Sequence, residues 1–219
     1  MNQSSLTGFI TYFYRFGDYF LVLLYVNLLW ICFTLLGGII LGWAPSTTAM
    51  FSVLRKKIME KDEPIFKQYW QVYRQEFLRS NGLGIIAITA AFILAVNIQY
   101  FAVETAWLFI AVRYLMIALI IIVSIMLMYV FPLMAHYETT LHHHLKNSLF
   151  LMIYQPIRTI VTIGLCLLVV QILTLFPVFI PFFGVSLLAF VIMLTTYFTF
   201  RHVEKRQEEI RESLEEQEV

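Results

Sequence analysis

Five long apolar stretches alternate with polar segments along this chain, and none of the five contains Asp, Glu, Lys or Arg. They are Tyr19–Trp43, Leu83–Val103, Tyr114–Ala135, Thr159–Phe176 and Phe179–Phe200. A helix that crosses a bilayer needs roughly 20 mostly apolar residues. A charge at the centre of such a helix costs about 2.5–3.5 kcal/mol on insertion. The pattern therefore predicts an all-α membrane protein, with residues 1–219 forming one domain around five transmembrane helices.

The polar segments between these stretches predict further helices outside the bilayer. Residues 46–80 and 139–157 are expected to be cytoplasmic helical segments, and residues 201–219 a solvated cytoplasmic tail. Gly and Pro residues in Gly37–Pro45 break the first helix. Ser46-Thr47-Thr48 then offers N-caps for a helix that runs to Lys61, and Asp62-Glu63-Pro64 begins another.

Aromatic side chains line one face of the helix expected over Ile65–Arg79. They are Phe66, Tyr69, Trp70, Tyr73 and Phe77, at spacings that return to the same face. Two interpretations are open for this amphipathic helix. It lies in the cytoplasmic interface of the membrane, or it docks a partner protein, and the periodicity favours the interface.

The distribution of basic residues predicts the orientation. Residues 55–79 contain seven Lys or Arg residues, so the positive-inside rule places this connection in the cytoplasm. With five spans, the N-terminus is then outside and the C-terminus is cytoplasmic. This arrangement puts thirteen of the fifteen basic residues inside, and only Arg15 and Arg113 outside.

Composition supports a membrane location and offers little chemistry. The chain is 60% hydrophobic and 13% charged, against about 25% charged in soluble domains. Cys32 and Cys166 lie within spans without an activating partner, so we expect two structural residues. The run His142-His143-His144 points in three directions on a helix and fits a polar cytoplasmic segment better than a metal site. We expect no catalytic residue, no cofactor, no metal and no nucleic-acid partner.

Uncharged polar residues remain within the spans. They are Asn27, Asn97, Gln99, Ser124 and Gln171. Such side chains commonly form hydrogen bonds between transmembrane helices. We favour this role over one in lining a substrate path. The absence of charge deep in any span argues against an ion-driven pump.

Several short motifs together resemble the YesL family of bacterial membrane proteins. They are Phe16-Gly17, Asn27-Leu28-Leu29-Trp30, Gly42–Met50, Leu54-Arg55-Lys56, Tyr69–Asn81, Leu145-Lys146-Asn147-Ser148 and Pro156-Ile157-Arg158-Thr159. Trp43 and Ala44 separate the Gly from the Pro, where the family pattern has them adjacent. The resemblance implies an integral protein of the bacterial cell membrane, usually encoded beside carbohydrate ABC importers, with no established catalytic residues.

The leading hypothesis is a non-enzymatic subunit that binds or stabilises permease and ATPase subunits of a carbohydrate ABC importer. The residues expected to contact this partner are Trp70, Tyr73, Phe77, Lys146, Asn147 and Arg158. Two alternatives remain open. One is a sugar permease in its own right, because Glu138–Pro156 faintly resembles the coupling loop of such permeases. The other is a membrane sensor or enzyme, and the histidine run His142-His143-His144 is the one sequence feature that favours it.

Overall fold

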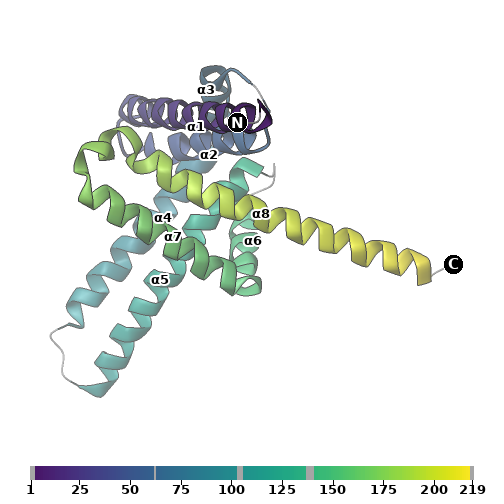
Figure 1. The fold of residues 1–219 in the computed structure, drawn as a ribbon. Helices are drawn as coiled ribbons and strands as arrows, with labels where there is room; N and C mark the ends of the chain where they lie inside the picture. Colours follow the sequence, from purple (N-terminus) through teal and green to yellow (C-terminus); the bar gives the residue numbers. More distant parts are fainter. Residues whose placement is uncertain (1–2, 62, 103–105, 137–140, 218–219) are drawn as a thin grey trace.

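The computed structural model describes residues 3–61, 63–102, 106–136 and 141–217, and every regular element in those ranges is a helix. In order they are α1 (Gln3–Leu36), α2 (Trp43–Ile58), α3 (Ile65–Gln75), α4 (Phe77–Tyr100), α5 (Trp107–His136), α6 (Leu141–Tyr154), α7 (Pro156–Leu175), the 3₁₀ turn η1 (Pro177–Phe179) and α8 (Ile180–Gln217) (Figure 1). Five of them, α1, α4, α5, α7 and α8, are long and apolar enough to cross a bilayer. The predicted fold class is confirmed.

The observed helix bounds differ from the predicted ones where the backbone breaks. The first span ends at Leu36, not at Trp43, because Trp43 already begins α2. The second begins at Phe77, six residues before Leu83, because α3 stops at Gln75 and only Glu76 separates it from α4. The last helix does not stop at Phe200 but continues through the tail to Gln217. Val103, Asp62 and residues 139–140 lie outside the described residues.

A tight glycine turn joins α1 to α2. A Cβ atom on Gly37 would lie 2.4 Å from the Cα of Gly42, and one on Gly42 would lie 2.3 Å from the carbonyl oxygen of Thr34. Gly38 also has a positive φ of 71°, which glycine adopts at little cost. The predicted caps at Ser46-Thr47-Thr48 are wrong, because α2 begins at Trp43 and the hydroxyls of Thr47 and Thr48 donate back to the carbonyls of Trp43 and Ala44.

The most deeply buried helix is α2, which packs against α1, α3, α4, α5 and α8. Ten of its residues are buried, among them Ser46, Thr48 and Ser52. The pattern of polar residues predicts a cytoplasmic helical segment over residues 46–80, and its cytoplasmic location stays a prediction. In the structure α2 lies in the centre of the bundle, where the Thr48 hydroxyl lies 2.8 Å from that of Ser80 and the Trp30 indole donates to Thr47 at 3.0 Å. These hydrogen bonds give Thr47 and Thr48 partners inside the bundle and so lower the cost of burying them.

Ion pairs place the start of α1 beside the end of α2. Arg15 pairs with Glu60 at 3.5 Å, and Asp18 pairs with Lys57. Figure 1 shows the two helices side by side, with the N-terminus at this end. Counting five spans from the sequence predicts Arg15 outside and residues 55–79 inside. That separation is wrong, because paired side chains cannot lie on opposite faces of a hydrocarbon layer about 30 Å thick.

Candidate functional site

Hydrogen bonds and ring contacts fasten α3 to the rest of the protein. The Tyr69 hydroxyl donates to the Ser46 carbonyl at 2.9 Å, and the Tyr73 hydroxyl donates to the Phe33 carbonyl at 3.2 Å. The ring centroid of Phe33 lies 5.1 Å from that of Tyr69 and 5.0 Å from that of Tyr73. Burial raises the pKa of the Tyr69 and Tyr73 phenols above their usual value, so both remain neutral donors at physiological pH.

The same helix presents a second, exposed surface. Phe66 is 53% exposed and Trp70 is 39% exposed, and the Arg74 guanidinium lies 5.6 Å from the Trp70 ring centroid. We call Phe66, Trp70 and Arg74 the α3 outer face. The aromatic periodicity left membrane interface and partner docking open for the whole stripe. The structure divides it: Tyr69 and Tyr73 are buried, whereas Phe66 and Trp70, whose rings also contact Phe33, stay partly exposed to another molecule.

The remaining predicted partner residues lie on other helices. Lys146 and Asn147 are exposed on α6, whose opposite side buries His144 and Ser148. Arg158 is partly buried at the start of α7 and donates to the Phe198 carbonyl of α8 at 2.9 Å. Because α3 packs on α2 and α4 while α6 packs on α5 and α7, the exposed members of the predicted set, Trp70 on α3 and Lys146 and Asn147 on α6, lie on two separate helices. Tyr73 is buried.

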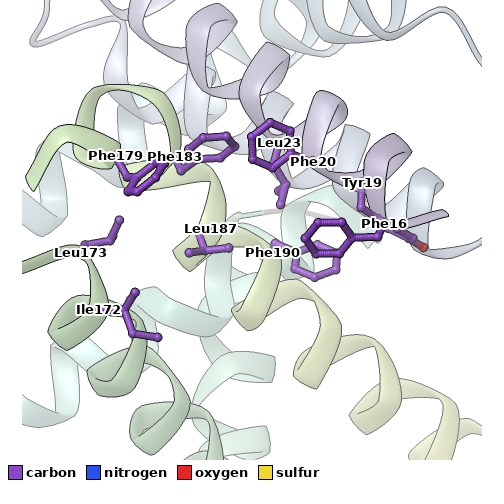
Figure 2. A pocket seen from close by; sticks show the side chains of 10 residues that line it. All are labelled: Phe16, Tyr19, Phe20, Leu23, Ile172, Leu173, Phe179, Phe183, Leu187 and Phe190. Atoms are coloured by element: carbon purple, nitrogen blue, oxygen red, sulfur yellow. The ribbon is translucent and has the colours of Figure 1, made fainter. Parts of the chain in front are cut away.

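An apolar groove of about 450 Å³ lies between α1 and the α7–η1–α8 hairpin (Figure 2). It is lined by Phe16, Tyr19, Phe20 and Leu23 of α1, by Ile172 and Leu173 of α7, by Phe179 of η1, and by Phe183, Leu187 and Phe190 of α8. The Tyr19 hydroxyl is the only polar side-chain group in this lining. The sequence alone could not reveal this groove, because its α8 lining belongs to a uniformly apolar span and its α1 lining meets α8 only in the folded protein.

A small polar pocket of about 170 Å³ lies on the neighbouring side of α1, at the charged end of the α1–α2 pair. Its polar lining residues are Asp18, Lys56, Lys57, Lys61, Glu63 and Gln68. Lys56 pairs with Glu63 and Lys57 with Asp18. The Lys57 ammonium also lies 5.8 Å from the ring centroid of Tyr19, so this pocket adjoins the apolar groove.

The polar residues of the spans behave in two ways. The Asn27 side chain joins α1 to α8, donating to the Pro181 carbonyl at 2.8 Å and accepting from the Val185 and Ser186 amides at 3.2 and 3.0 Å. The predicted interhelical role is confirmed there. The prediction of a hydrogen bond between helices is wrong for Asn97 and Ser124, because each donates to a carbonyl of its own helix.

The other candidate chemistry remains dispersed. Cys32 is exposed and Cys166 partly buried, and both are free thiols. The structural role expected for both stays a prediction, and Cys32 does not exert it from the core. His142 and His143 are exposed on α6 whereas His144 is buried, so the run is helical and its rings diverge. Among the described residues, no group of three His, Cys, Asp or Glu side chains could hold a metal ion.

Fold and site together define a polytopic helical membrane protein in which α3 is bound to the bundle and an apolar groove lies between α1 and α8. The chain belongs to the YesL-like family of bacterial membrane proteins. Residues 23–98 match the family model described as "Protein of unknown function, DUF624".

Three relatives from Bacillus subtilis (strain 168) carry this assignment. The chain is 38% identical to "Uncharacterized protein YesV" over 84% of its own length and 87% of the relative. It is 35% identical to "Uncharacterized protein YteU", over 87% of this chain and 86% of the relative. It is 28% identical to "Uncharacterized protein YesL", over 89% of this chain and 92% of the relative. No solved structure matches the chain. None of these descriptions indicates an enzyme family.

Proposed function

We propose that this protein is a non-enzymatic membrane subunit that binds and stabilises a carbohydrate or oligosaccharide ABC importer. The YesL resemblance implies this role. The α3 outer face is the observation that carries the proposal for this chain. Tyr69 and Tyr73 hold the helix rigidly, so Phe66, Trp70 and Arg74 are presented without further ordering of the backbone. Aromatic and Arg side chains dominate the energetics of protein interfaces.

The lining of the apolar groove favours a non-enzymatic role. Hydrolysis or group transfer requires polar groups that move protons or stabilise charge. The groove between α1 and α8 offers carbon side chains and one phenol. A binding or scaffolding role uses such a surface directly.

We infer that the protein resides in the bacterial cell membrane, with the charged end of the α1–α2 pair facing the cytoplasm. Arg15, Lys56, Lys57 and Lys61 gather there, and basic residues favour the cytoplasmic side. Because α8 runs antiparallel to α1, with Phe190 beside Tyr19 and Pro181 beside Asn27, its tail leaves at the same end. Both termini are then cytoplasmic, and this arrangement requires that α2, folded back along α1, returns the chain to the cytoplasmic side before α4 begins.

Affinity purification in mild detergent, with mass spectrometry of the bound proteins, tests the proposed partner. Wild type should recover the permease and ATPase subunits of an importer. Trp70→Ala should reduce this recovery, since interface hot spots contribute roughly 2 kcal/mol or more. The α6 variant Lys146→Ala/Asn147→Ala and the α7 variant Arg158→Ala test the second surface in the same way.

Trp107→Ala is the matched control, because Trp107 is exposed on α5 at the far end of the α4–α5 hairpin. It removes the same side chain without touching α3. Tyr73→Ala and Phe77→Ala are less informative, because Tyr73 is an internal contact and Phe77 is partly buried. If wild type recovers no importer subunit, or if the Trp70, Lys146/Asn147 and Arg158 variants all recover as much as wild type, the proposal is wrong.

A further inference from the structure

We propose that the apolar groove and the adjoining polar pocket form one binding site for an anionic phospholipid. An acyl chain lies in the groove, and the phosphate lies among Lys56, Lys57 and Lys61. This site is independent of the importer partner proposed above.

The groove has the size and chemistry for a lipid chain. Its volume of about 450 Å³ falls within the range of roughly 300–1,000 Å³ for small-ligand sites. It opens between helices that are apolar enough to cross the membrane, so its contents exchange with the bilayer and not with water. Figure 2 shows the rings of Phe179 and Phe183 at one end and those of Phe16 and Phe190 at the other, with Leu187 between them.

The polar pocket has the charge for one phosphate. Three lysines against two carboxylates, Asp18 and Glu63, leave a net charge of +1 in its lining. A phosphodiester carries one negative charge, so occupancy neutralises the pocket. The two carboxylates and Gln68 can additionally accept hydrogen bonds from the hydroxyls of a glycerol headgroup. Phosphatidylglycerol supplies both groups.

Neighbouring residues of α1 place the two compartments in the order that a lipid requires. Tyr19 lines the groove while Asp18, the preceding residue, lines the pocket. The Lys57 ammonium spans the boundary, since it pairs with Asp18 and also lies over the Tyr19 ring. Aromatic and basic side chains gather at the headgroup level of membranes. Charge at one end and carbon at the other match an amphipathic lipid oriented as in the surrounding leaflet.

A lipid suits this site better than a transmembrane helix of another protein. A helix is about 10–12 Å across with its side chains, which is wider than a single acyl chain. The chain of a lipid is narrow enough to lie between α1 and α8 while the spans stay packed through Asn27 and Pro181.

The test begins with wild-type protein purified in mild detergent, followed by lipid extraction and mass spectrometry. Reconstitution in nanodiscs of equal parts phosphatidylglycerol and phosphatidylcholine, then re-extraction in detergent, measures preference. We expect retained phosphatidylglycerol to exceed phosphatidylcholine at least about tenfold, equivalent to roughly 1.4 kcal/mol.

Two variants separate the halves of the site. Leu187→Trp fills the groove and should abolish retention of either lipid. Leu167→Trp on the exposed side of α7 is its control and should retain phosphatidylglycerol. Lys57→Gln/Lys61→Gln should keep a lipid but lose the preference for phosphatidylglycerol. Lys67→Gln/Lys146→Gln removes the same charge from exposed positions elsewhere. This control should keep the preference for phosphatidylglycerol.

Three results would overturn the proposal. The first is wild type that retains no phospholipid, and the second is retention without preference for phosphatidylglycerol over phosphatidylcholine or phosphatidylethanolamine. The third is unchanged preference in the Lys57/Lys61 variant. Monodisperse elution is required of every variant. If Leu187→Trp fails to fold, the lysine variant and its control still decide the assignment.

Discussion

The amide of Asn27 joins α1 to α8 through both of its polar atoms. It is buried to 1% exposure and bridges the Pro181 carbonyl and the Val185 and Ser186 amides, which lie one turn apart in α8. In hydrocarbon there is no water to replace these partners. Residue type alone predicted such a bond, but it could not distinguish Asn27 from Asn97, which has the same side chain and bonds only to its own helix.

Asn27→Leu should destabilise the folded protein by about 1–3 kcal/mol, because it removes three hydrogen bonds between α1 and α8 where no water replaces them. Thermal unfolding in detergent, followed by loss of monodisperse protein, measures the change. Asn97→Leu is the matched control and should shift stability by less than about 0.5 kcal/mol, as for most exposed positions. Equal effects of the two substitutions would contradict the proposed link between α1 and α8.

At the scale of elements, the α1–α2 hairpin decides the arrangement of the bundle. The turn brings Thr34, Gly37 and Gly42 so close that only hydrogen fits at the two glycines. It folds α2 back along α1, and the Ser46 carbonyl then receives the Tyr69 hydroxyl of α3. The glycines in the sequence predicted a break at this point. They could not predict that the following polar helix would return into the bundle, because hydropathy averages ignore hydrogen bonds made between helices.

Gly42→Ala should sharply lower the amount of folded protein in the membrane, because its Cβ would lie 2.3 Å from the Thr34 carbonyl oxygen and backbone must move. Gly164→Ala provides the comparison, since no atom lies within 4 Å of its added Cβ in α7. There the substitution should be neutral or stabilising by roughly 0.5–1 kcal/mol, as for glycine in a helix interior. Quantitative blotting of membranes and detergent melting measure both. Normal levels of Gly42→Ala would show that the turn tolerates a side chain.

For the whole molecule, one end of the bundle collects the charges of distant segments. Arg15 and Asp18 meet Glu60 and Lys57 there, and Arg55 donates to the Ala135 carbonyl at 3.1 Å. Figure 1 shows α8 leaving the bundle toward the C-terminus, while the α4–α5 hairpin extends away as a separate arm. We propose that the charged end faces the cytoplasm, because the positive-inside rule favours basic residues on that side.

Reporter fusions at the N-terminus, after residue 63 and at the C-terminus should therefore all report the cytoplasm. The first position is decisive, since counting five spans from the sequence places it outside. Charge reversal of Lys57 and Asp18 together should preserve the result, because their ion pair is retained. An external N-terminus with a cytoplasmic residue 63 would contradict the contact between Arg15 and Glu60.

The sequence by itself determined the helical membrane class, the five candidate spans and the family. These follow from local properties, namely charge-free length and short motifs, which each stretch carries independently of its neighbours. Only the tertiary structure decided that α2 is buried, that Tyr73 faces inward while Trp70 faces outward, and that Asp18 meets Lys57. Those outcomes depend on contacts between residues far apart in the chain. A polar helix can be buried at low cost once another helix supplies its hydrogen-bond partners.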